Sequence, residues 1–76
     1  MPDKLEAIFG QILRRRREEA GLTQEDLGHA AGLSRNYIGM LERGERVPTI
    51  VVVRQLAFAL GTSMSVLVQE LDQAAS

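Results

Sequence analysis

The most constraining feature of the sequence is a connection of three residues, Gly32-Leu33-Ser34, between two short segments in which apolar residues have helical spacing. Thr23 is a preferred helix-capping residue at the start of the first segment, and Asp26 follows three residues later, in the capping-box position. Ser34 is the equivalent cap of the second segment, which ends at Gly44. Two helices with so short a connection have to turn sharply, and glycine supplies the positive φ that the turn needs.

Each of the two segments has one apolar face, so that both can pack against a common core. These faces consist of Leu27, Ala31, Ile38 and Leu41, with Leu33 at the corner between them. Gly28 has no side chain where the two helices should cross most closely. This spacing is typical of a helix-turn-helix, whose second helix can enter the major groove of DNA. The positions that point away from the core, and would enter the groove, are Arg35, Asn36, Gly39, Met40 and Arg43.

Similar signals divide the rest of the chain into short helices. Starts are predicted at Asp3 with Glu6, at Pro48-Thr49 and at Ser63, and ends at Gly21 and Gly61. The valine run 51–53 favours a strand by propensity alone, but it lies between a cap and a helical pair of leucines, so we predict a helix there. The pattern predicts five short helices in one domain over residues 1–72, and a frayed tail over residues 73–76.

The composition excludes several classes of function. A chain of 76 residues buries only about 60% of its unfolded surface, so self-association would stabilise it. The absence of cysteine excludes disulfides, thiolate metal sites and cysteine nucleophiles. With His29 as its one histidine and no phosphate-binding loop, the chain is not expected to be an enzyme or to bind a metal, a cofactor or a small-molecule ligand.

No apolar run approaches the roughly 18 residues of a membrane span and no signal sequence opens the chain, which predicts a cytoplasmic protein. The net charge of −1 argues against nonspecific coating of nucleic acid but allows a local basic face.

The stretch TQEDLGHAAGLSRNYIGMLERGERVPT resembles the helix-turn-helix family of phage repressor and Cro proteins, the XRE-like group of bacterial and phage regulators. The resemblance continues backward into LRRRREEAGLT and forward into LAFALGTSMSVL, and so covers nearly the whole chain. Small stand-alone regulators, such as restriction–modification controller proteins, are among the proteins it resembles. The resemblance implies an all-α, lambda-repressor-like fold of five helices, with the helix-turn-helix at the second and third. It also implies a transcriptional regulator that binds a palindromic operator in double-stranded DNA as a homodimer, and associates with the nucleoid when bound.

The resemblance assigns DNA contacts to the second and third helices. Arg35 and Asn36, in the first turn of the third helix, would reach base edges, since arginine suits guanine and asparagine suits adenine. Met40 offers apolar contact only, for example with a thymine methyl group. The residues expected near the DNA backbone are Gln24, which would also brace the first residue of the recognition helix, and Tyr37, Arg43 and Arg46. For Arg35 and Asn36 the alternative is a plain polar helix start, and for Arg43 and Arg46 it is pairing with Glu45.

The run Arg14 to Arg17 invites a nucleic-acid interpretation, but four successive residues point around most of a helix and cannot form one patch. We predict a mixed solvated face, in which Arg14 or Arg15 could touch phosphate. Arg16 takes a position that is usually leucine in the family, so its stem should pack while its guanidinium reaches solvent. Arg17 matches a position that forms a buried ion pair in family members, here with Glu42. His29 is expected to be an inert surface residue.

Val51 and Phe58 lie two helical turns apart on one face of the fourth predicted helix. We predict that they form a two-fold dimer seam together with Val66 of the fifth helix. The alternative is that the fifth helix folds over Val51 and Phe58. A protein-interaction module, such as an adaptor or antitoxin that uses the same helices mainly to hold a protein partner, is the alternative function.

Overall fold

Helix-capping side chains define where four of the five helices begin in the computed structural model, which describes residues 4–76. The hydroxyl of each cap accepts a hydrogen bond from a backbone N–H three residues later, as predicted, at Thr23, Ser34, Thr49 and Ser63. At Thr23 the Asp26 carboxylate also accepts from the Thr23 backbone N–H at 3.0 Å, which completes the predicted capping box. The predicted cap at Asp3 lies outside the described residues.

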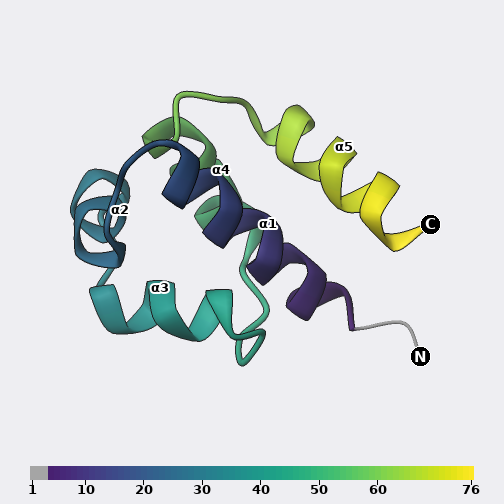
Figure 1. The fold of residues 1–76 in the computed structure, drawn as a ribbon, viewed down its shortest axis with the longest axis horizontal. Coiled ribbons are helices and arrows are strands. Elements are labelled where there is room, and N and C mark those ends of the chain that lie inside the picture. Colours follow the sequence, from purple (N-terminus) through teal and green to yellow (C-terminus); the bar gives the residue numbers. More distant parts are fainter. Residues whose placement is uncertain (1–3) are drawn as a thin grey trace.

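The five predicted helices are confirmed (Figure 1). They are α1 (Leu5–Glu19), α2 (Gln24–Ala31), α3 (Arg35–Glu42), α4 (Ile50–Ala59) and α5 (Met64–Ala75). The valine run 51–53 is helical, since burial on the core side of α4 outweighs the strand propensity of β-branched residues. The predicted tail needs a correction, because α5 continues to Ala75 and so includes residues 73–75.

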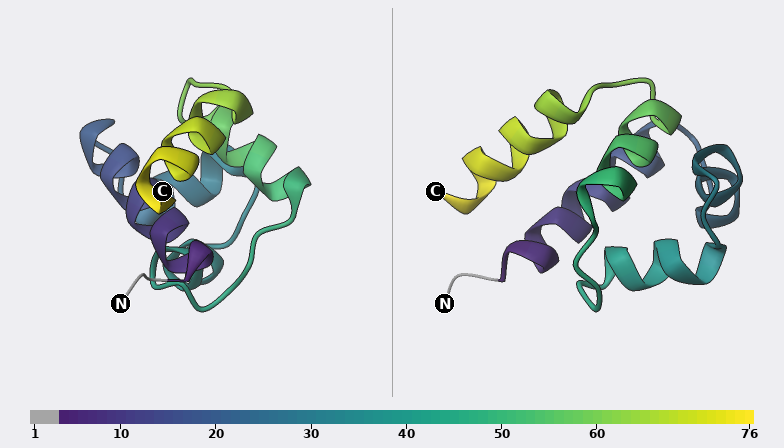
Figure 2. Two further views of the ribbon diagram at one scale, coloured as in Figure 1. Left: turned by 90° about the vertical axis from the view of Figure 1, so that its right-hand side faces the viewer. Right: turned by 180° about the vertical axis from the view of Figure 1, so that it is seen from behind.

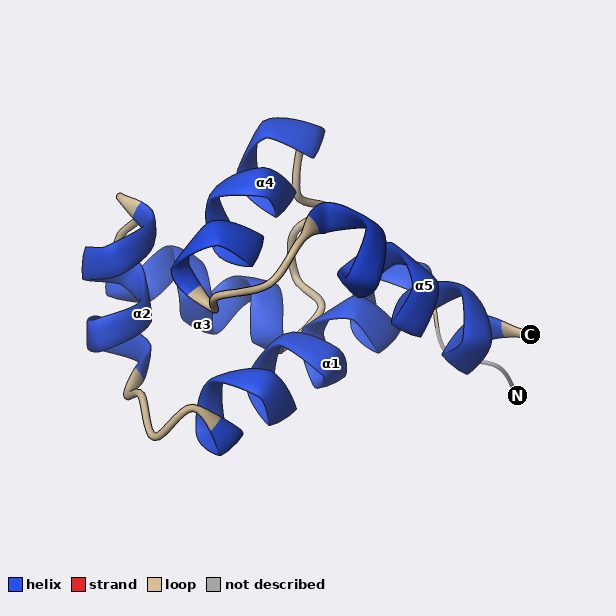
Figure 3. Ribbon diagram, turned by 90° about the horizontal axis from the view of Figure 1, so that it is seen from above, coloured by secondary structure: helices blue, strands red, loops and turns tan. Residues whose placement is uncertain are grey.

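Helix α1 is the central element of the fold. It packs against α3 on one side and α5 on the other, while α2 packs against α3 and α4. Figures 1 and 3 show α2 and α5 at opposite ends of the molecule. Figure 2 shows that the start of α1 and the end of α5 lie at the same end. The first four helices, α1, α2, α3 and α4, all contribute to the main core. Its buried residues are Phe9, Leu13, Leu27, Ala31, Ile38, Leu41 and Leu56. A smaller cluster of Ile12, Ala57 and Leu67 attaches α5.

Two glycines allow helices to approach closely. A Cβ at Gly28 would lie 2.6 Å from the backbone oxygen of Leu33, which agrees with the predicted close crossing at the turn. A Cβ at Gly10, which sequence reasoning did not single out, would lie 2.4 Å from the backbone oxygen of Leu41. The contact between α1 and α3 therefore requires glycine at position 10.

All four arginines of the run in α1 pair with carboxylates rather than forming a basic patch. Arg14 pairs with Glu18 one turn along the helix. Arg15 and Arg16 both pair with Glu70 and so connect α1 to α5. The guanidinium of Arg16, which was expected to reach solvent, instead lies part-buried against α5.

No single helix among residues 4–76 has the length and apolar composition to cross a membrane; α4 and α5 pass that test only as a pair bent by 107°.

Candidate nucleic-acid interface

The turn between α2 and α3 orients the candidate recognition helix. Gly32 adopts a φ of 72°, in the left-handed region that favours glycine. The backbone N–H of the next residue, Leu33, donates to the backbone oxygen of Gly28 at 2.8 Å and closes the turn. Leu33 packs against the core at the corner, as predicted. With α3 fixed by Ile38 and Leu41 on its inner face, the opposite face of the helix is directed to solvent.

The outer face of α3 carries the side chains predicted to contact DNA. Arg35, Asn36 and Arg43 are exposed there, and Met40 is half-buried. Tyr37 is also half-buried, because its ring packs against the main core. Gly39 is covered, although it belongs to the same face.

A buried ion pair connects α1 to the end of α3. The Nε of Arg17 lies 2.6 Å from Oε2 of Glu42, and its Nη2 lies 3.1 Å from Oε1. The side chains are only 11% and 4% exposed, respectively, so little water screens the pair. Arg17 also donates to the backbone oxygen of Leu22, which brings the α1–α2 connection into the same network. The hydrogen bond to Glu42 raises the pKa of the Arg17 guanidinium above its ordinary value. This is the pair that the resemblance implied.

Gln24 also belongs to this network, and its hydrogen-bond partner is not the expected one. Its Nε2 donates to Oε1 of Glu42 at 3.1 Å. The expected brace to Arg35, the first residue of α3, is therefore replaced by a hydrogen bond to Glu42, the last residue. The Glu42 carboxylate can accept this N–H while it also binds Arg17, whereas the guanidinium of Arg35 only donates and could bond to Gln24 through its amide oxygen alone.

The two arginines after α3 differ in their surroundings. Arg43 donates to Glu45 through Nε at 2.9 Å and Nη2 at 3.3 Å, which agrees with the alternative of pairing with Glu45. The bond from Arg43 lowers the pKa of the Glu45 carboxyl below its ordinary value, so both groups stay charged at neutral pH. Arg46 is exposed in the connection that follows. His29 is exposed on α2.

A shallow polar hollow of about 310 Å³ lies between the start of α2 and the outer face of α3. Its lining residues are Gln24, Arg35, Asn36, Gly39 and Arg43. The structure thus brings together two residues assigned to bases and two assigned to the DNA backbone. A second polar hollow shares Gln24 and Arg35 and extends toward Arg17.

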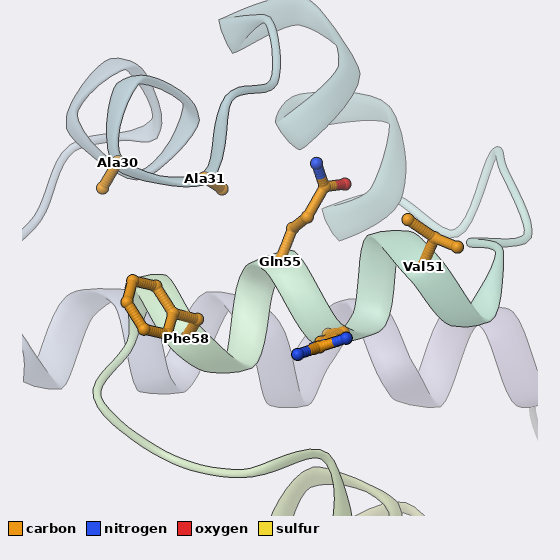
Figure 4. A pocket seen from close by; sticks show the side chains of 6 residues that line it. Ala30, Ala31, Val51, Gln55 and Phe58 are labelled. Carbon is orange, nitrogen blue, oxygen red and sulfur yellow. The ribbon is translucent and has the colours of Figure 1, made fainter.

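Two apolar surfaces lie elsewhere. On α4, Phe58 is 83% exposed and Val51 is 63% exposed, so the alternative that α5 folds over them is wrong. They line a hollow of about 420 Å³ across from Ala30 and Ala31 of α2 (Figure 4). Val66 is half-buried on α5 and does not line this hollow.

The second apolar surface was not found from the sequence. It is a groove of about 270 Å³ at the end of the molecule where α1 begins and α5 ends. Its lining residues are Leu5, Glu6, Phe9, Val47, Pro48, Val53, Val68 and Leu71. Only the apolar pair Val47-Pro48 in the connection after α3 could have indicated it, because the other lining residues come from three separate helices, α1, α4 and α5.

The comparison with known proteins decides the family. A family model described as a helix-turn-helix domain matches residues 8–71. The chain belongs to this helix-turn-helix family. The expected fold and family are therefore confirmed, and the family is one of transcriptional regulators.

Individual helix-turn-helix proteins show how far the similarity extends. An HTH-type transcriptional regulator of Sinorhizobium fredii, y4dJ, is 42% identical over 66 residues, which cover 87% of this chain and 86% of that protein. The crystal structure of the restriction–modification controller protein C.AhdI of Aeromonas hydrophila is similar with a TM-score of 0.79 and 42% identity, over 82% of this chain and 94% of that one. The controller protein C.Esp1396I, solved as a tetramer in complex with its natural 35 base-pair operator, has a TM-score of 0.86 and 30% identity over 96% of both chains.

Proposed function

We propose that this chain is a sequence-specific DNA-binding regulator that inserts α3 into the major groove of a palindromic operator and acts as a homodimer. The observation that carries the proposal is the outer face of α3, which is polar and is anchored to α1 and α2 by the Arg17–Glu42–Gln24 network. A recognition surface has to keep its geometry while side chains reach base edges, and this anchoring provides that rigidity. The operator complex of C.Esp1396I supports the same use of the fold.

The proposed contacts divide into those that read sequence and those that position the protein. Arg35 and Asn36 reach base edges and Met40 makes apolar contact. Contacts to the backbone are assigned to Gln24, Tyr37, Arg43 and Arg46. Because Arg43 already holds Glu45, a phosphate has to share its guanidinium with that carboxylate.

Replacing Arg35 by alanine should weaken operator binding by about 1–3 kcal/mol and relax selectivity at one base pair. The physical reason is the loss of a bidentate contact to a base, which no neighbouring side chain can replace. Titration of the operator and of its single-base variants with both proteins measures the effect. An equal loss on every sequence would mean that Arg35 contacts phosphate alone.

The dimer seam is proposed at Val51, Phe58 and Val66. A two-fold seam would place two recognition helices about 34 Å apart, on successive major grooves. The support is the exposed apolar side chains of α4, because exposed apolar surface of this kind marks interaction sites on soluble proteins.

Replacing Phe58 by glutamate should give a folded monomer that binds operator DNA at least about tenfold more weakly, a loss of about 1.4 kcal/mol. A carboxylate in an apolar seam loses its hydration when the seam forms, even beside Arg54, which lines the same hollow, and each monomer then binds only one half-site. Light scattering and DNA titration provide the two readouts. Val68→Glu, in the separate groove, is the matched control. A Phe58→Glu protein that stays dimeric, with a monomeric Val68→Glu protein, would move the seam to that groove.

Selection of random duplex DNA by the purified protein at near-physiological salt tests the function itself. An enriched inverted repeat, with half-site centres about 10 bp apart, is the expected result. A folded protein that enriches no sequence would contradict the proposal.

The protein-interaction module stays the second candidate because Phe58 and Val51 form an exposed apolar hollow with α2. Such a surface is unusual on a small monomer and fits an apolar partner side chain. Failure of the DNA selection, with loss of a bound partner in Phe58→Glu, would favour this candidate.

A further inference from the structure

The three glycines inside helices differ in why they are needed. A Cβ at Gly10 or Gly28 would collide with backbone oxygens at 2.4 and 2.6 Å, so packing requires glycine at both positions. At Gly39 the nearest atom is Nη1 of Arg43 at 3.0 Å, the far end of a flexible side chain. Gly39 also lies inside α3, with an ordinary helical backbone, where glycine lowers helix stability relative to alanine. The fold therefore does not explain this glycine.

The absent side chain at Gly39 determines how its neighbours are arranged. The guanidinium of Arg43 lies over Gly39, with Nε and Nη2 on Glu45 and Nη1 toward the glycine. The amide of Gln24 approaches from α2, 3.6 and 3.7 Å from the position that a Cβ would occupy. The result is the polar hollow described above, which Arg35 and Asn36 also line.

We propose that this hollow binds one phosphate group of the DNA backbone, and that Gly39 is a positioning residue because a side chain there would fill the space. The proposal rests on the proposed function and assigns a place to one of its backbone contacts. It makes Arg43 and Gln24 joint ligands of a single phosphate, rather than two separate contacts.

The chemistry of the lining favours an anion. Two guanidiniums and two carboxamides surround the hollow, and no carboxylate belongs to its lining. Nη1 of Arg43 lies toward Gly39 and makes neither of the two bonds to Glu45, which come from Nε and Nη2. Gln24 Nε2 bonds to Glu42 with one N–H and carries a second. Charge-assisted bonds from guanidinium to phosphate oxygen are strong contacts that do not depend on base sequence.

Substitutions at Gly39 test the proposal with DNA. Leucine at this position points back along α3, toward Arg35, and fills the hollow. We expect Gly39→Leu to lower affinity about tenfold on operator and unrelated duplex alike, and to reduce the salt slope by about 0.9, the value for one phosphate. Gly39→Ala should raise the melting temperature by a few degrees and have a smaller effect on binding. Gln11→Leu, at an exposed position of α1, is the control for an added leucine. Unchanged affinity and slope in a folded Gly39→Leu protein, or a loss confined to one base pair, would overturn the proposal.

A measurement without DNA separates this proposal from the proposed function. Inorganic phosphate is titrated into the isotope-labelled protein while the backbone amide signals of Gly39 and Arg43 and the side-chain amide of Gln24 are followed. Saturable shifts at these three residues in the natural protein, absent in Gly39→Leu, are expected. If they occur while DNA selection fails, the hollow is an anion site and the proposed function is wrong. If they do not occur while DNA binds, the phosphate assignment is wrong.

Discussion

Replacing Glu42 by alanine is expected to lower the free energy of unfolding by about 3–5 kcal/mol, the largest effect of any single substitution considered for this chain. The substitution leaves the guanidinium of Arg17 buried without its carboxylate, and it also removes the hydrogen-bond acceptor of Gln24. Domains of this size have a total stability of about 5–15 kcal/mol, so the substitution should remove a large share of the stability of the fold. Chemical denaturation followed by circular dichroism measures the change.

Two controls separate the loss of a buried partner from the loss of any carboxylate. Glu45→Ala removes the exposed partner of Arg43, where solvent screens the pair, and should cost much less stability than Glu42→Ala. The double variant Arg17→Met with Glu42→Leu should recover most of the stability, because replacing both charges with apolar groups leaves neither unpaired. Equal losses in Glu42→Ala and Glu45→Ala would show that the buried network does not stabilise the fold.

Replacing Gly10 by alanine is expected to destabilise the protein by about 3 kcal/mol, even though alanine is the better helix former. The added Cβ would meet the backbone oxygens of Leu41 and Glu42 at 2.4 and 2.6 Å, so α1 and α3 have to move apart. Because both oxygens belong to α3, the proposed recognition helix, the operator affinity of the folded protein should fall as well. Thermal unfolding and DNA titration of folded protein measure the two effects.

Gly39→Ala is the matched control for this prediction, because it makes the same chemical change in a helix without a backbone collision. It should stabilise the protein by up to about 1 kcal/mol, the difference in helix propensity. A Gly10→Ala protein that is as stable as Gly39→Ala would contradict the close packing of α1 on α3.

Local signals in the sequence were sufficient to predict the helices. Thr23, Ser34, Thr49 and Ser63 each cap a helix by contacting a residue three positions away, so the information lies within one turn. The helix-turn-helix core was equally predictable, because Leu27 and Ile38 follow helical spacing on either side of a short turn.

Contacts between distant residues could not be predicted in the same way. Glu70 lies more than fifty positions after Arg15 and Arg16, and nothing around it indicates that α5 returns alongside α1. The partner of Gln24 depended on which residues of α3 come within its reach, and this follows from how α2 and α3 cross. The close approach of α1 and α3 at Gly10 could not be predicted either, since a glycine inside a helical pattern can be merely tolerated or structurally required.

The pairing of the α1 arginines with glutamates has a consequence for how such a protein would search a chromosome. A bacterial genome presents millions of unrelated sites that compete with one operator, and attraction to them comes from uncompensated positive charge. Here the four arginines of α1 pair with three carboxylates of the same chain, Glu18, Glu42 and Glu70, so most of their charge is compensated and adds little to that attraction. Under the proposed function, fewer molecules are then retained on unrelated sequence, and a lower copy number is enough to occupy a single control site.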